Sequence, residues 1–321
     1  MTDAVPRAQF ALMLHSVPHL GPRGIARILR ETPDAEVCLP AVRAWRMSPD
    51  ALQSEYKLHA EAAHCIALRK DELLSSSAKI ASAAEGLRIR TLTEQDADYP
   101  SMLRDYQADA PPIVYAHGNL GLLRDRKYAV VNSAKIGGRS IEATRDIAST
   151  LAAEGLAAVT SHNTQGYQIV GLAAKSRNAP ILLVLDRGIL SAFPQGLGWE
   201  PVAQARIWNL RFDPERDLVV SPFRLYDRWI GANGRERDRM VFALADVVVA
   251  VEIRAGGVME AECLRALRLG REVYVCESSD GPLPGGNASL LSRGCAPIPV
   301  GWEHSMLATL DLPIEGSEEA F

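Results

Sequence analysis

The sequence predicts an α/β protein: a doubly wound parallel sheet preceded by a small, all-helical N-terminal domain. Its 321 residues are enough for two domains of about 150 residues each. Apolar residues recur at helical spacing as far as about residue 90. From residue 127, short apolar runs alternate with Gly-containing turns and helical segments. Runs that are apolar at nearly every position are typical of strands buried on both faces of a parallel sheet.

The helical domain is expected over residues 1–90. Apolar side chains lie at helical spacing near residues 10–14 and 25–29, and an Ala-rich stretch covers about residues 51–85. Residues 91–126 are predicted to be a connector, because prolines such as Pro100, Pro111 and Pro112 prevent a continuous helix.

The α/β domain is expected over residues 127–310, followed by an acidic tail at 311–321. Its predicted strands are 128–131, 156–160, 181–185, 246–251 and 272–276. Its predicted helices are 139–154, 166–177 and 258–269. Strands that alternate with helices in this way indicate a doubly wound sheet, with helices covering both faces.

Composition excludes several classes of protein. The apolar fraction of 47% and the charged fraction of 23% are ordinary for a globular protein. No apolar run is long enough to cross a membrane, and no secretory signal is visible at the N-terminus. Five widely spaced cysteines without a C-x-x-C pair favour a cytoplasmic location. No H-E-x-x-H motif is present, so neither a metal ion nor another cofactor is expected.

The net charge of −4 argues against a strong global attraction to nucleic acid. All of this negative charge lies in the acidic tail, since the net charge of the first 310 residues is zero. Any nucleic-acid binding must therefore depend on a local basic patch.

A first candidate ligand site is the loop that follows the first predicted strand, because ligands of open α/β sheets bind at the carboxyl ends of the strands. Adjacent glycines allow a ligand to approach the backbone, and a helix N-terminus favours phosphate. A tight turn with a solvated lysine and arginine explains the same residues equally well. The candidate residues of this loop are Asn132, Ser133, Lys135, Gly137, Gly138 and Arg139.

Two further regions are expected at the same edge of the sheet. Ser161, Asn163 and Gly166 follow the second strand, where polar side chains can bind a ligand or cap the next helix. Arginines at alternate positions can grip phosphates, or they can pair with the acids between them. Ser161 is not expected to be a catalytic nucleophile with the adjacent His162, because no G-x-S-x-G motif is present, and no catalytic residue is predicted. The candidate residues of the last region are Arg235, Arg237, Arg239, Gly256, Gly257 and Glu260.

Taken in order, these segments resemble the DprA (Smf) family of DNA-processing proteins, within the wider Smf/DprA–LOG superfamily. The resemblance covers residues 99–300. It rests on these landmarks: Tyr99-Pro100, Pro111-Pro112 with Gly118-Asn119, Arg237-Asp238-Arg239 before the strand that ends at Glu252, Ala255-Gly256-Gly257, Gly270-Arg271, and Gly286 to Leu291 with Gly294. Residues 17–29 are similar to a helix-hairpin-helix segment of the small SAM-like domain that precedes the core in this family.

The resemblance implies a Rossmann-like core and a non-enzymatic protein that binds single-stranded DNA through phosphate contacts. Such a protein protects DNA during natural transformation and hands it to a RecA-type recombinase, and family members pair as homodimers through the core. The ligand loops depart from the family pattern: Ala134 stands where the family has arginine, Gln168 where it has an acid, and Glu260 where it has threonine.

An alternative function is a nucleotide-binding sensor or a nucleotide-cleaving enzyme of the same superfamily. The LOG-type phosphoribohydrolases carry G-G-x-G-T-x-x-E, of which only the two glycines remain at 256–263. The carboxylates of Glu260 and Glu262 would be available for a ribose hydroxyl.

Overall fold

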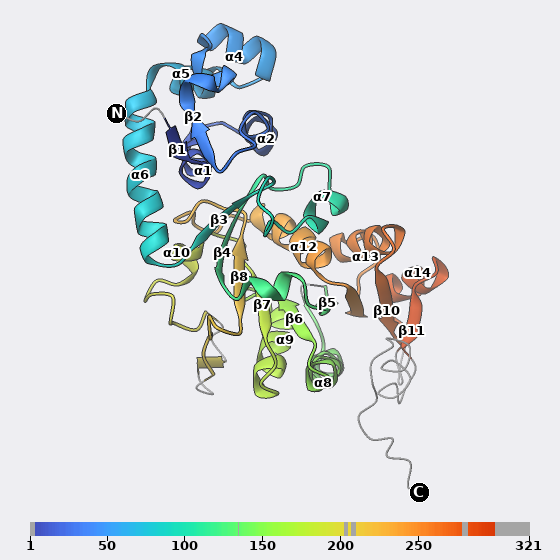
Figure 1. The fold of residues 1–321 in the computed structure, drawn as a ribbon. Helices are drawn as coiled ribbons and strands as arrows, with labels where there is room; N and C mark the ends of the chain where they lie inside the picture. Colours follow the sequence, from blue (N-terminus) through green and yellow to red (C-terminus); the bar gives the residue numbers. More distant parts are fainter. Residues whose placement is uncertain (1–3, 134, 202–204, 207–209, 278–281, 299–321) are drawn as a thin grey trace, which may run out of the picture. The chain divides into compact units, whose positions relative to one another are not determined.

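The structure is a computed structural model that describes residues 4–133, 135–201, 205–206, 210–277 and 282–298 (Figure 1). The chain forms two compact units. Unit 1 comprises residues 1–123, 185–199 and 213–231, and unit 2 comprises residues 124–184, 200–212 and 232–321. The predicted acidic tail and Ala134 lie outside the described residues.

The N-terminal part of unit 1 is mainly helical, as predicted. Helix α1 buries Phe10, Leu12, Met13 and Leu14 and packs against the long helix α6. Two strands of three residues each, β1 (Ala4–Pro6) and β2 (Glu36–Cys38), form an antiparallel pair that the sequence did not predict. Runs this short carry no period-two signal. The helices are α1 (Arg7–Ser16), α2 (Pro22–Leu29), α3 (Arg43–Arg46), α4 (Pro49–Tyr56), α5 (Ala60–Leu68) and α6 (Lys70–Gly86), with the 3-10 turn η1 (Leu39–Ala41).

The rest of unit 1 is built around three antiparallel strands. Strand β4 (Ile113–Gly118) pairs with β3 (Arg90–Thr93) on one side and with β8 (Leu218–Ser221) on the other. Residues 91–126, predicted to be a connector, therefore contain a central strand that begins directly after Pro112. This region is completed by α7 (Met102–Tyr106), η2 (Leu120–Leu123) and α10 (Ile189–Ala192).

Unit 2 contains the predicted doubly wound parallel sheet. Its strands lie in the order β11-β10-β9-β5-β6-β7, and each neighbouring pair is parallel. Numbered along the chain of unit 2, this is the order 6-5-4-1-2-3 of a Rossmann fold. The strands are β5 (Lys127–Asn132), β6 (Ala157–Thr160), β7 (Ile181–Val184), β9 (Val247–Glu252), β10 (Glu272–Cys276) and β11 (Ala296–Ile298).

Helices cover both faces of this sheet (Figure 1). Helices α8 (Gly138–Ala153) and α9 (Gln165–Ser176) pack against each other, and α12 (Asn233–Leu244) packs against α13 (Val258–Arg268). Helix α14 (Gly285–Ser292) packs on β9 and β10. The helices at 139–154, 166–177 and 258–269 were predicted to within one residue at each end, because their apolar faces have clear helical spacing.

All five cysteines are free, and three of them are buried. Burial raises the pKa of the Cys263 thiol far above its ordinary value. Among the described residues, none of the helices combines the length and the apolar character needed to cross a bilayer.

Candidate functional site

The first and third predicted loops meet at the point where the strand order of unit 2 reverses. Strands β5 and β9 are neighbours there, and each continues into a loop that enters a helix. The backbone N–H of Ser133 donates to the carbonyl oxygen of Glu252 at 2.8 Å, and the Ser133 Oγ accepts from the N–H of Arg254 at 2.8 Å. Open α/β sheets bind ligands at such a reversal.

The second loop joins them through Asn132, the last residue of β5. The pairing of β5 with β9 shifts register between Val131 and Asn132, an irregularity that changes the direction of a side chain at the end of a strand. The Asn132 Nδ2 donates to Thr144 Oγ1 at 3.0 Å, and it lies 3.1 Å from the place where a Cβ on Gly166 would be. Glycine at 166 therefore allows the second loop to approach the first. The buried Asn132 Oδ1 has no hydrogen-bond partner among the described residues.

Arg237 lies beneath the second loop, and its side chain is only 4% exposed. Its guanidinium donates to Ser161 Oγ at 3.1 Å and to Asn163 Oδ1. It also pairs with Asp238 at 2.7 Å and stacks over the Tyr167 ring at 4.8 Å. The expectation that Arg237 offers its charge to a ligand in solvent is wrong, because the guanidinium is used inside the protein.

The side chain of Asn163 does not cap the following helix. The N-cap of α9 is Thr164, and no side chain caps that end. The Asn163 carboxamide binds Arg237 instead. Ser161, Asn163 and Arg237 thus hold the loop to α12 rather than to the start of α9.

Burial raises the pKa of both acidic groups that surround Arg237, Asp238 and Tyr167. For Asp238, the neighbouring charge of Arg237 opposes this rise. The Tyr167 hydroxyl donates to Asp238 Oδ1 at 3.0 Å, and burial together with that carboxylate raises the pKa of Tyr167 well above its usual value. The network is a buried ion pair whose polar atoms are also hydrogen-bonded, which is the form in which buried charges are tolerated.

The three arginines of α12 have different surroundings. Residues two positions apart on a helix point in nearly opposite directions, so 235, 237 and 239 cannot form one cluster. Arg239 lies 3.7 Å from the carboxylate of Glu236 and 3.6 Å from that of Glu262. Arg235 is exposed and has no ion-pair partner among the residues that the structure describes.

The start of α8 is the open part of the site. Lys135, Gly137, Gly138 and Arg139 are all exposed. Gly137 is the N-cap residue, and its N–H donates to the Glu252 Oε2 at 3.2 Å. No atom lies within 4 Å of a Cβ built on Gly137 or Gly138, so the space in front of this helix end can admit a ligand. The first N–H groups of any helix have no partner inside the helix, which makes this end suited to anions.

The turn before α13 is held by Glu260. Gly256 has a φ of +69°, a conformation that favours glycine. Its N–H donates to the carboxylate of Glu260. A hydrogen bond from Ser289, and then the one from Gly256, lowers the pKa of Glu260. Glu260, predicted as a ligand contact, is buried and stabilises the Gly256-Gly257 turn.

The sequence did not single out Arg254, Glu252 or Tyr167 as site residues. Arg254 is exposed at the end of β9 and has no ion-pair partner in the described part of the chain. Its position two residues after a buried strand was a usable signal, because ligand-binding residues collect at that edge. Nothing in the sequence marks Tyr167, whose ring is placed under Arg237 only by the tertiary fold.

Residues 90–301 match the family model of DNA recombination-mediator protein A. The chain belongs to this family. The match begins at the first residue of β3 and includes all three candidate loops and α12. No curated protein sequence matched the chain.

Solved structures of DNA processing protein A have a similar fold. The Streptococcus pneumoniae protein is 18% identical, with a TM-score of 0.68 over 94% of this chain and 98% of that one. The Helicobacter pylori protein, which was studied for its single-stranded DNA binding mode, is 18% identical, with a TM-score of 0.54 over 70% of this chain and 97% of that one. The fold predicted from the family resemblance is thus confirmed.

Proposed function

We propose that this chain binds single-stranded DNA through phosphate contacts at the loop edge of unit 2. The observation that carries the proposal is the meeting of the three loops, joined by hydrogen bonds of Ser133 and Arg237, around the open start of α8. Membership of the family and the DNA-binding Helicobacter pylori relative support the ligand class.

The proposed contacts divide between backbone and side chains. The start of α8 offers N–H groups and open space at Gly137 and Gly138 to one phosphate. The exposed cations Lys135, Arg235 and Arg254 belong to the three surrounding segments and attract further phosphates. Contacts to phosphate carry no base information, so we expect binding without sequence preference.

We further propose that the site binds without catalysing a reaction. Two of its buried carboxylates already have partners, since Asp238 pairs with Arg237 and Glu260 accepts from Gly256. Neither is placed to act as a general base in open solvent.

The test is a titration of a fluorescent single-stranded oligonucleotide at several salt concentrations. Replacing both Lys135 and Arg235 with Ala removes two phosphate contacts, each worth about 0.7 in the slope of log K against log salt. We expect the slope to fall by one to two units, and the thermal melting temperature to stay unchanged. The reason is that neither side chain has an ion-pair partner among the described residues.

The matched control is the double substitution Arg177→Ala and Arg268→Ala. It removes the same charge from exposed residues at the C-terminal ends of α9 and α13, at the opposite edge of the sheet. If both double variants lowered the salt slope and the DNA affinity equally, the proposed site would be contradicted. A mononucleotide that raises the melting temperature while oligonucleotides fail to bind would contradict the DNA function itself.

The finer parts of the proposal concern partners. From the family resemblance, we propose that the chain acts in the cytoplasm during natural transformation, self-associates as a homodimer and passes DNA to a RecA-type recombinase. Light scattering after size-exclusion chromatography tests the dimer. A strand-exchange assay, with DNA presented as a preformed complex with this protein, tests the transfer.

A further inference from the structure

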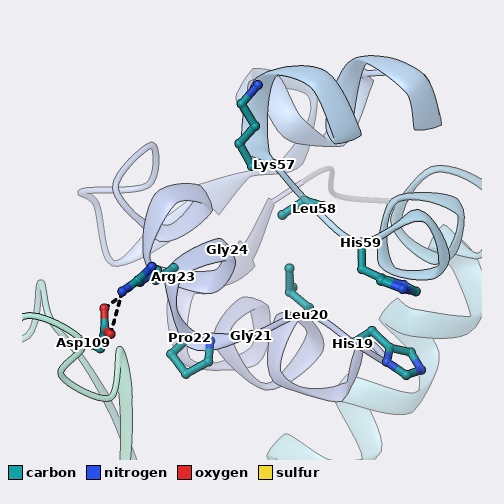
Figure 2. A pocket seen from close by; sticks show the side chains of 10 residues that line it. All are labelled: His19, Leu20, Gly21, Pro22, Arg23, Gly24, Lys57, Leu58, His59 and Asp109. Carbon is teal, nitrogen blue, oxygen red and sulfur yellow. Dashed lines mark hydrogen bonds and ion pairs between the residues drawn. The ribbon is translucent and has the colours of Figure 1, made fainter.

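A pocket of about 320 Å³ lies in unit 1 and is lined mainly by residues of its helical part. It is lined by the turn between α1 and α2, by the start of α2 and by the segment that leads into α5. Figure 2 shows the imidazoles of His19 and His59 beside each other at one end of this pocket. Their ring centroids are 4.9 Å apart, and their planes are inclined by 32°.

A carboxylate completes the group. Glu61 lies in the first turn of α5, and its Oε2 is 2.8 Å from the Nε2 of His19. One ligand atom from each of His19, His59 and Glu61 can be chosen so that all three lie within 4.8 Å of one another. The three residues come from two segments far apart in the sequence, which are brought together by the packing of the helical region.

We propose that His19, His59 and Glu61 bind a Zn²⁺ ion. Zn²⁺ prefers imidazole nitrogen and carboxylate oxygen at about 2.0–2.2 Å, and three protein ligands leave a fourth position for water. Ligand atoms around such an ion lie about 3.4 Å apart. The separations here need only small side-chain rotations, which the 58% exposed His19 and the 65% exposed Glu61 can make.

Binding the ion replaces weak contacts with stronger ones. The proton on His19 Nε2 is lost to solvent as the ring takes the tautomer protonated at Nδ1. The contact with Glu61 is then given up, and His19 Nε2 and Glu61 Oε2 both become ligands. The His59 Nδ1 accepts the N–H of Glu61 at 3.3 Å, a long hydrogen bond that ligation through this nitrogen would replace. Two cations also line the pocket. Arg23 is bound to Asp109 at 2.7 and 2.8 Å, and Figure 2 shows Lys57 extending away from the imidazoles.

The ion would cross-link the turn after α1 to the start of α5. Because it binds the folded chain and needs both segments in place, it should stabilise this part of unit 1 by an amount that rises with the logarithm of its concentration.

The experiment uses the full chain without a polyhistidine tag, stripped with EDTA and titrated with ZnCl₂ by calorimetry. We expect one ion per chain, with a dissociation constant of about 10 µM or tighter, and a melting temperature that rises with added Zn²⁺. Cobalt as a substitute should show absorption typical of nitrogen and oxygen ligands, without a thiolate charge-transfer band.

Three variants test the ligands while preserving the local backbone. Asn in His19→Asn tolerates the positive φ of 56° at this position, and Ser in His59→Ser keeps a capping side chain on α5. Glu61→Gln removes the charge with little change of shape. Each should weaken Zn²⁺ binding at least tenfold.

The controls are His64→Ala, on the same helix but outside the group, and Cys38→Ser, which removes an exposed thiol. Both should bind Zn²⁺ as the unaltered chain does. Failure of the unaltered chain to bind Zn²⁺ would overturn the proposal, as would full binding by the three ligand variants or a loss in either control.

Discussion

Two parts of the loop edge use the same residue types in opposite ways. Around Arg237, the guanidinium, the carboxylate of Asp238 and the ring of Tyr167 are buried and bound to one another. Around the start of α8, Lys135 and Arg254 are exposed and have no ion-pair partner in the described part of the chain. The first part gives the loops their shape, and the second leaves charge available to a ligand.

The difference shows that an arginine in a basic motif is not by itself a ligand contact. A buried guanidinium must be paired, whereas an exposed one keeps its hydration and remains free to bind an anion. Each part should therefore respond to substitution in its own way, the buried part by losing stability and the open part by losing affinity.

The largest effect should come from Arg237→Ala. This change leaves the Asp238 carboxylate buried without its cation and removes the hydrogen bonds to Ser161 and Asn163. Breaking one side of a buried pair costs about 3–5 kcal/mol, so we expect the midpoint of urea unfolding to fall sharply. Arg235→Ala is the control and should change stability by about 0.5 kcal/mol or less. If Arg237→Ala unfolds like the control but loses DNA affinity, the distinction between the two parts is wrong.

A partly buried polar pair in unit 1 gives a further prediction, which concerns the dependence of stability on pH. The Nδ1 of His15 is 2.8 Å from the hydroxyl of Tyr115, and burial together with Arg224 lowers the pKa of His15 to about 4. An unfolded histidine titrates near 6.5. The unfolded chain therefore takes up this proton between about pH 6.5 and 4 while the folded chain does not, so stability is lost as the pH falls through this window.

The loss assigned to His15 approaches about 3 kcal/mol at the acid end of the window. His15→Gln keeps a hydrogen-bonding group but does not titrate, so its unfolding free energy should depend less on pH. Denaturant curves at pH 7.5, 6 and 5 for both proteins measure the difference. Parallel pH profiles would show that His15 is not the group responsible.

Gly256→Ala should have an intermediate effect. Placing a Cβ at a φ of +69° costs about 1–2 kcal/mol, and the change disturbs the turn that Glu260 holds. Gly137→Ala is the comparison, since its φ is −81° and its Cβ would meet open space. We expect Gly256→Ala to lower the melting temperature and Gly137→Ala to leave it unchanged. A similar loss in both variants would mean that the start of α8 is less open than its geometry indicates.

The smallest effect should be that of Arg254→Ala, which tests a residue the sequence did not single out. Removing one phosphate contact should lower the salt slope by about 0.7 and weaken DNA binding modestly. Its side chain is exposed, so the melting temperature should not change. An unaltered slope in the same titration would remove Arg254 from the proposed interface.

The sheet of unit 2 could be predicted well because its strands are almost continuously apolar. The ends of β5, β6, β7, β9 and β10 each lie within one residue of the predicted ends. Of the strands that escaped prediction, β1, β2 and β11 are three residues long, β3 and β4 flank or lie in the Pro-rich segment, and β8 is a four-residue strand far from the regular alternation of strands and helices. In that segment the prolines argue against a continuous helix, yet Pro111 and Pro112 stand directly before a strand.

The meeting of the three loops could also be predicted, because parallel strands carry their carboxyl ends to one edge. The direction of each side chain could not. Positions 235, 237 and 239 look like one basic cluster in the sequence, yet successive alternate residues of α12 have exposed, buried and half-buried side chains. The group of His19, His59 and Glu61 was missed because no short motif contains all three residues.

The bond between the Glu252 carboxylate and the N–H of Gly137 has a consequence for the lifetime of a complex. This carboxylate occupies the helix end where an incoming phosphate would bind, so it acts as an internal competitor. It satisfies the N–H of the N-cap residue Gly137 when no phosphate is bound. We therefore expect it to shorten the residence time of DNA bound at the proposed site.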